Sequence, residues 1–146
     1  MKTPLLMFIA VGLLMPANNA QAGDQQDLEK LQGTWKLVSA AQDGKVLSDD
    51  KVKQTTIVFK ADTFRFPGLA ENATSKEGTI KLDATKKPKQ MDATSTQGDV
   101  MLGIYELEGN RYKVCFAPVG KARPDDFASN TGSGYILQFW ERPKLP

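Results

Sequence analysis

Apolar and polar residues alternate along most of the chain after about residue 33. The pattern is clearest where Ile57 and Phe59, and later Ile80 and Leu82, are flanked by polar residues, and again in the run 111–117. Strict alternation predicts β-strands with one face in a core and the other in water. Eight strands are expected, at residues 34–40, 55–60, 63–66, 78–83, 89–93, 100–107, 111–117 and 135–141.

Turn-forming residues separate the expected strands. Asp43-Gly44 and Gly109-Asn110 have the composition of tight turns, because Gly and Asn tolerate a positive φ. Residues 118–134 are expected to form a long loop at one rim. Short strands in direct succession predict an all-β fold, a small closed antiparallel up-and-down β-barrel of about eight strands, with a two-sheet sandwich as the alternative.

The first 22 residues have the pattern of an export signal. Lys2 precedes an apolar run over 5–15, a break at Pro16 and the small-residue sequence 20–22. We expect a signal peptide over 1–22 and one β-barrel domain over 23–146, exported to a periplasmic or extracellular location. The apolar run is short for a membrane span and no later run is long enough, so no span is expected after signal removal. An uncleaved N-terminal anchor is the alternative.

A short helical turn is predicted between this leader and the first strand. Asp24 or Asp27 is placed to cap the turn, Leu28 and Leu31 share one face, and Gly33 is placed to end it. The turn is expected to plug or flank one end of the barrel.

Composition narrows the function classes. Without Lys2 the chain has 18 basic and 17 acidic residues, so no nucleic-acid partner is expected. It has no His, and Cys115 is the single Cys. Ser-His and Cys-His activation are therefore excluded, as are imidazole metal sites and thiolate zinc clusters. We predict no metal, no cofactor, no internal disulfide and a monomer.

Four ordered pieces of the sequence resemble a known family. They are 31–39 (LQGTWKLVS) followed by Asp43-Gly44; 82–83 with 88–92 (PKQMD); 103–107 (GIYEL); and 115–117 (CFA) with 123–124 and Phe127. In this order they resemble the lipocalin-like domain that recurs in secreted proteins of planctomycete-type bacteria and has no assigned function. The opening is also similar to the Gly-x-Trp start of the wider calycin group, which implies a closed antiparallel barrel.

Two departures from the calycin pattern bear on the ligand. The stretch 41–54 is too short for the helix pair that covers the cavity of intracellular fatty-acid-binding proteins, and the last strand lacks the Arg-x-Tyr that holds a carboxylate in such barrels. Fatty-acid binding is therefore not implied by the resemblance.

Trp35 and Arg142 are the expected structural seal of the barrel. The indole of Trp35 either lines a ligand cavity or plugs one end of the core, where removing it would cost about 3–5 kcal/mol. The resemblance to lipocalin-like barrels, in which a late Arg often stacks over this Trp, makes Arg142 the candidate partner. Closure of the barrel, rather than ligand recognition, is the expected role.

The expected function is binding of a small apolar or amphipathic ligand inside the barrel. A void of about 300 Å³ or more would favour this function. A filled interior would favour the alternative, a protein-interaction or inhibitor module that binds a protein partner through rim loops such as 118–134. The expected cavity residues are Phe59, Phe64, Leu82, Ile104, Phe116 and Phe139.

A third hypothesis is a hydrolase. It would use Cys115 as a reactive thiol on the outer face beside Arg111 and Lys113, or a carboxylate pair. A buried, inert thiol and solvated turn carboxylates are the simpler interpretations. The three lysines of the segment 83–92 likewise form either an anion-binding lip or a solvated turn. The carboxylates considered are Asp83, Asp92, Glu106, Asp125 and Asp126.

Overall fold

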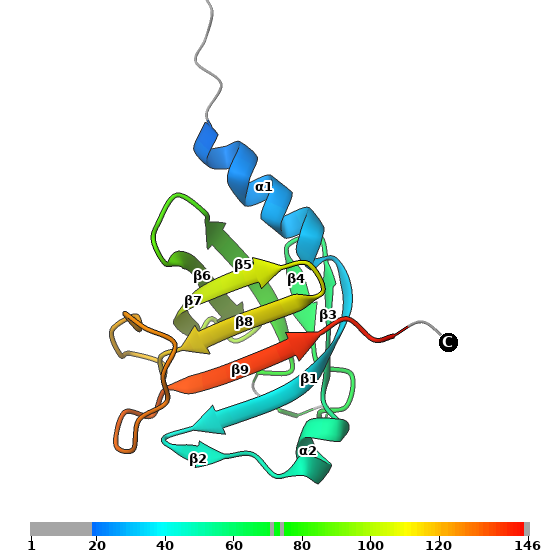
Figure 1. Cartoon of the computed structure of the whole chain (residues 1–146), viewed down its shortest axis with the longest axis vertical. Coiled ribbons are helices and arrows are strands. Elements are labelled where there is room, and N and C mark those ends of the chain that lie inside the picture. Colours follow the sequence, from blue (N-terminus) through cyan, green and yellow to red (C-terminus); the bar gives the residue numbers. More distant parts are fainter. Residues whose placement is uncertain (1–18, 71, 74, 145–146) are drawn as a thin grey trace, which may run out of the picture.

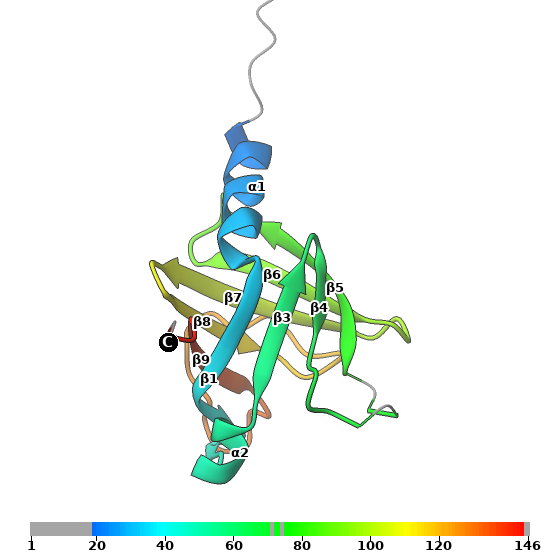
Figure 2. The ribbon, with the colours of Figure 1, turned by 90° about the vertical axis from the view of Figure 1, so that its right-hand side faces the viewer.

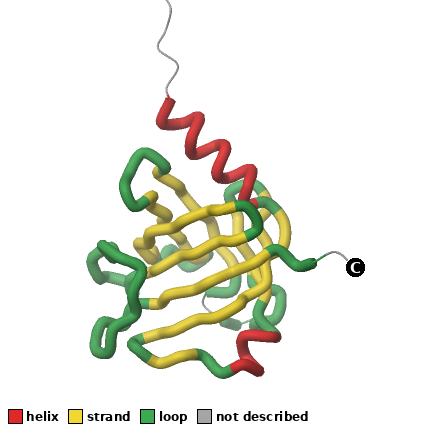
Figure 3. Tube along the Cα trace, viewed as in Figure 1, coloured by secondary structure: helices red, strands yellow, loops and turns green. Residues whose placement is uncertain are grey.

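The computed structural model describes residues 19–70, 72–73 and 75–144, which form a closed antiparallel β-barrel with two helices (Figures 1 and 3). Neither described helix combines the length and the apolar character that a membrane span requires. In chain order the elements are α1 (Asn19–Leu31), β1 (Gly33–Gln42), β2 (Lys45–Val46), α2 (Asp49–Lys53), β3 (Thr56–Lys60), β4 (Thr63–Arg65), β5 (Glu77–Asp83), β6 (Lys89–Ser95), β7 (Val100–Glu108), β8 (Arg111–Phe116) and β9 (Ile136–Glu141).

Eight strands close the barrel. From β3 to β9 each strand pairs antiparallel with the next, and β1 pairs with β3 through residues 33–36 and with β9 through residues 36–42. The two-residue strand β2 pairs with the end of β1 and lies outside the ring. The predicted closed barrel is therefore confirmed, and the eight expected strands correspond to β1 and β3 to β9.

The helices differ from the expectation. Instead of a short turn, α1 is a 13-residue helix that begins at Asn19, so Asp24 and Asp27 lie within it and cap nothing. The predicted cleavage point after Ala22 falls inside α1, while residues 1–18 lie outside the described part of the chain, and the leader stays a prediction. The short helix α2 was not predicted, although Asp49 and Asp50 in its first turn complement the helix dipole.

Inward-facing side chains fill much of the barrel. Partners in register share a face of the sheet, so Leu37 on β1, Trp140 on β9 and Tyr112 on β8 point inward together. Burial of each large apolar side chain contributes about 1.5–3 kcal/mol. The buried core comprises Leu31, Trp35, Leu37, Val52, Ile57, Phe59, Phe64, Ile80, Leu82, Met91, Tyr105, Tyr112, Val114 and Trp140.

The long loop between β8 and β9 is fastened to the turn between β1 and β2. Asp43 Oδ1 accepts a hydrogen bond from the Gly132 N–H at 2.7 Å, and Ser129 Oγ accepts one from the Gly44 N–H at 3.1 Å. Gly44 has a φ of 77°, and a Cβ there would lie 2.8 Å from the backbone N of Thr131. The Asp43-Gly44 sequence therefore forms a turn and also anchors the loop.

The two ends of the barrel are built differently. In Figures 1 and 2, α1 stands at the upper end, where β1 begins and β9 ends. The opposite end is where β1 ends, and Figure 1 shows the long loop between β8 and β9 beside it at the left, while α2 lies at the lower right. We call the first the sealed end and the second the open end.

Candidate ligand cavity

Trp35 and Arg142 lie together at the sealed end. The Arg142 guanidinium carbon is 4.1 Å from the centre of the Trp35 ring, and Trp35 is fully buried. Gly33 has a φ of 96°, and a Cβ there would come within 3.1 Å of Arg142 Nη1. The glycine of the Gly-x-Trp opening thus leaves room for the cation that covers the tryptophan.

The same two side chains satisfy the carbonyl groups at the end of α1. Trp35 Nε1 donates to the Leu31 carbonyl at 2.8 Å, and Arg142 donates to the carbonyls of Gln32 and Lys30, each at 2.6 Å. Carbonyls at a helix C-terminus have no partner within the helix, so these bonds attach α1 to the barrel. The seal is therefore a hydrogen-bonded unit that includes the helix end.

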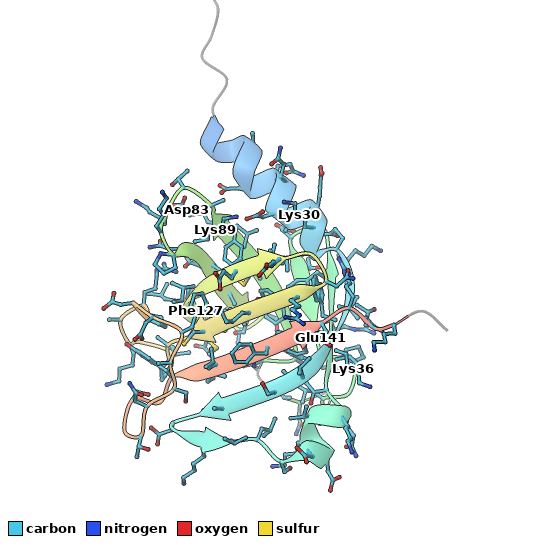
Figure 4. The ribbon with its side chains drawn as sticks, in the orientation of Figure 1. Lys30, Lys36, Asp83, Lys89, Phe127 and Glu141 are labelled. Atoms are coloured by element: carbon cyan, nitrogen blue, oxygen red, sulfur yellow. The ribbon has the colours of Figure 1, made fainter. Side chains whose placement is uncertain are left out.

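Asp27 provides a second attachment of α1, which sequence reasoning missed. Its side chain is buried, and Oδ2 accepts hydrogen bonds from Lys89 Nζ at 2.9 Å and from the Tyr105 hydroxyl at 2.8 Å. Figure 4 shows Lys89 on β6 close to α1. Burial, and then the bond to Asp27, raises the pKa of the Tyr105 hydroxyl, which therefore stays a donor. Lys89 and Tyr105 both fall in the family-like pieces of the sequence.

A cavity of about 230 Å³ lies inside the barrel toward the open end. Side chains from β3 to β9 line it, and most are apolar. Phe66, Met101, Phe116 and Ile136 come from the parts of the wall farthest from α1. The volume is below the roughly 300 Å³ at which drug-sized pockets begin, so the interior is neither filled nor large.

The cavity contains three of the six residues predicted to line it. Phe59, Phe64 and Phe116 border the space. Leu82 faces the interior but lies at the other end, in a hollow beside Leu28 of α1. Leu82 is therefore corrected from a cavity residue to part of the sealed end.

Ile104 and Phe139 were predicted to line the cavity, but neither faces the interior of the barrel. Ile104 on β7 is in register with Cys115, and Phe139 on β9 is in register with Lys113, so both lie on the outer face of the sheet. Ile104 is buried outside the barrel, whereas 40% of Phe139 is exposed. Phe139 lines a different feature, an external groove of about 420 Å³ that it shares with Val38.

Tyr112 separates the cavity from the seal. Its ring lies 5.8 Å from that of Trp35 and 6.0 Å from that of Phe59, measured between ring centres. Its hydroxyl donates to the thioether sulfur of Met91 at 3.3 Å, and both residues line the cavity. Burial raises the pKa of the Tyr112 hydroxyl, so the group at the cavity floor remains protonated.

Cys115 lies on the outer face of β8, as the alternation indicates, but the long loop covers it. The thiol is fully buried and lies 3.5 Å from the carbonyl oxygen of Ala128. Burial raises the pKa of the Cys115 thiol, which disfavours the thiolate that a nucleophile needs. This arrangement matches a structural cysteine.

Arg123 fastens the loop that covers Cys115. Its Nη1 donates to the Gly103 carbonyl at 2.8 Å, and its Nη2 lies 2.7 Å from Asp92 Oδ1. Arg123 and Asp92 form an ion pair whose geometry is not that of a hydrogen bond. The buried Oδ1 of Asp92 accepts no hydrogen bond from any described residue. Lys113 Nζ makes a cation–π contact with Phe127, 4.1 Å from the centre of its ring. Figure 4 shows Phe127 in front of the sheet. Arg123 and Phe127, both in the last family-like piece, therefore hold the loop against the barrel.

Asp83, Glu106 and Lys89, three more of the candidate charged residues, have structural partners. Asp83 accepts hydrogen bonds from the Thr85 hydroxyl and backbone N–H, which lower the pKa of its carboxyl group. Glu106 pairs with Lys113 at 2.6 Å. Lys89 is bound to Asp27, so the turn does not present three free lysines to an anion. Among the described residues, no His, Cys, Asp and Glu side chains gather in a group of three or more that could hold a metal ion.

No family model, curated protein or solved structure matches this chain.

Proposed function

We propose that this protein is an exported, lipocalin-like barrel that binds one small apolar or amphipathic molecule in the cavity at its open end. The observation that carries the proposal is the cavity itself, an apolar space of about 230 Å³ in a barrel whose other end is closed by Trp35 and Arg142. The lipocalin-like sequence pieces and the leader-like pattern of residues 1–22 support the family and the export.

The cavity volume limits the size of the ligand. A 150 Å³ apolar cavity accommodates benzene, so this space suits a molecule of about nine or ten non-hydrogen atoms. Burying about eight methylene groups at 0.8 kcal/mol each gives about 6 kcal/mol, which corresponds to a Kd of about 10–100 μM. A longer ligand would extend through the open end.

The external groove favours a second candidate, a protein-interaction module. Val38 and Phe139, which line it, are 47% and 40% exposed. Exposed apolar side chains beside charged ones are typical of weak protein interfaces. The unfilled interior makes ligand binding the preferred function.

Butylbenzene, which has about ten non-hydrogen atoms, is a direct probe of the cavity. We expect it to bind with a Kd of about 10–100 μM in a calorimetric titration and to shift the methyl NMR signals of Met91 and Met101, which line the cavity. The other three methionines, Met1, Met7 and Met15, precede the described residues.

Two variants separate the cavity from the external groove. Ala93→Phe places a ring in the cavity and is expected to weaken butylbenzene binding at least tenfold, whereas Phe139→Ala alters the groove alone and leaves binding unchanged. Thermal unfolding of each variant is the control for folding. Failure of the folded wild-type protein to bind butylbenzene, or weaker binding in Phe139→Ala alone, would refute the proposal.

A further inference from the structure

The cavity floor carries a hydrogen-bond donor with a poor partner. Tyr112 is 3% exposed, and among the described residues its hydroxyl donates to Met91 Sδ at 3.3 Å. A thioether sulfur is a weak acceptor, so a buried hydroxyl with this partner binds an oxygen acceptor more strongly. The rings of Trp35 and Phe59 hold Tyr112 in place, and the donor is therefore fixed before a ligand enters.

Gln138 provides a second donor on the cavity wall. Its amide oxygen accepts a hydrogen bond from Trp140 Nε1 at 3.3 Å. Because an indole nitrogen only donates, this bond assigns the oxygen to the Trp140 side and leaves the NH₂ group as the free end. That NH₂ donates to no acceptor within the described part of the chain.

The cavity lining carries no charge. No Asp, Glu, Lys or Arg side chain is among the described residues that line it. The polar side chains that line it are Tyr112, Gln138, Ser75 and Trp140, and the indole N–H of Trp140 is bonded to Gln138. A carboxylate brought to this floor would lose its hydration without gaining a cation, which is costly in an apolar site. A neutral oxygen acceptor loses far less hydration, and it gains a hydrogen bond from the Tyr112 hydroxyl in place of the weak bond to Met91.

From these features we infer that the ligand is an uncharged molecule of about ten non-hydrogen atoms that carries an accepting oxygen, such as a ketone or ester, and places that oxygen at Tyr112. This inference rests on the proposed ligand-binding function. It assigns Tyr112 a role in specificity, with Gln138 as an additional donor. The apolar tail of the ligand then points toward the open end.

Four probes of similar size test the inference by calorimetric titration: butylbenzene, methyl heptyl ketone, octanoate and methyl octanoate. We expect the ketone and the ester to bind at least tenfold more tightly than octanoate at pH 7, because only octanoate is charged. Tyr112→Phe removes the hydroxyl but keeps the ring. It is expected to weaken ketone binding about 3- to 10-fold and to leave butylbenzene binding within about twofold.

Each result decides the inference. Octanoate binding as tightly as the ketone, or an unchanged ratio of ketone to butylbenzene affinity in Tyr112→Phe, would overturn it and indicate that ligands enter tail first with the head group in water. If butylbenzene binds but the ketone does not gain from Tyr112, ligand binding stands and the specificity role fails. If no probe binds, including butylbenzene, the proposed function fails as well.

Discussion

The sealed end and the open end of the barrel contain similar aromatic side chains but use their polar groups in opposite ways. At the sealed end, Trp35 Nε1, the Arg142 guanidinium and the Asp27 carboxylate all have strong partners. Toward the open end, the Tyr112 hydroxyl has a weak partner, and space remains beside it. Fully paired groups stabilise the fold, whereas incompletely paired groups beside a void are available to a ligand.

The largest expected difference between the two ends is in stability. Trp35→Ala removes a filled core side chain, the indole bond to α1 and the surface on which Arg142 stacks, so the free energy of unfolding should fall by about 3–5 kcal/mol. Phe116 is only partly buried, so Phe116→Ala should cost less, about 2 kcal/mol. Denaturant unfolding of both variants measures the decrease in the free energy of unfolding. Equal decreases in the two variants would contradict the distinction between the ends.

Asp27 tests the attachment of α1. Asp27→Ala leaves Lys89 Nζ and the buried Tyr105 hydroxyl without their acceptor and should lower the free energy of unfolding by about 1–3 kcal/mol. Lys30→Ala on the same helix is the matched control, since the Lys30 side chain is 67% exposed and lies 4.0 Å from Asp27. Its effect should stay within about 0.5 kcal/mol. A loss no larger in Asp27→Ala than in this control would show that the cluster does not hold α1.

Alkaline pH tests the two buried tyrosines. Burial raises the pKa of the Tyr105 and Tyr112 hydroxyls in the folded state, so the stability that their protonated forms provide is complete below pH of about 10 and is lost as the pH rises above it. For the fully buried Tyr112 this loss is about 1.4 kcal/mol for each pH unit. Denaturant unfolding at pH 9, 10 and 11, about one pH unit apart, measures this loss. The free energy of unfolding should fall less steeply with pH in Tyr112→Phe than in the wild type. An equally steep fall of the unfolding free energy in the wild type and the variant would contradict a contribution from the Tyr112 hydroxyl.

The smallest expected effect concerns the loop at the open end. Arg123→Ala releases the loop from Gly103 and Asp92 and should change the free energy of unfolding by about 1 kcal/mol. The same change should speed labelling of Cys115 by a thiol reagent, because the loop covers this thiol. Labelling of folded wild-type protein at the rate of unfolded protein would contradict the burial of Cys115.

Sequence reasoning predicted the strands well because strand alternation is a local property. The inward face of β8, with Tyr112, Val114 and Phe116, could be assigned from alternation alone. The assignment of Ile104 to the interior was wrong because the run 100–107 contains apolar residues on both faces. Only the register with Cys115, which depends on pairing between strands, identifies its outer position.

Contacts across long sequence separations account for the other differences. Asp27 lies 62 residues before Lys89 and 78 before Tyr105, so its burial could not be inferred from the helix sequence, which indicated only a capping residue. Arg142 and Trp35 are even farther apart in the sequence, and their pairing was predicted only from the resemblance to lipocalin-like barrels. The size of the cavity depends on how all the strands pack, and no local pattern encodes it.

The two tryptophans provide the most direct test, because only Trp140 lines the cavity. Trp35 forms the seal, and Trp140 lines the cavity. In a titration with butylbenzene followed by ¹⁵N NMR of the two indole N–H signals, the Trp140 signal should move in a saturable manner while the Trp35 signal stays nearly fixed. Movement of Trp35 with a fixed Trp140, or two fixed signals up to the solubility limit of the probe, would contradict a ligand cavity confined to the open end.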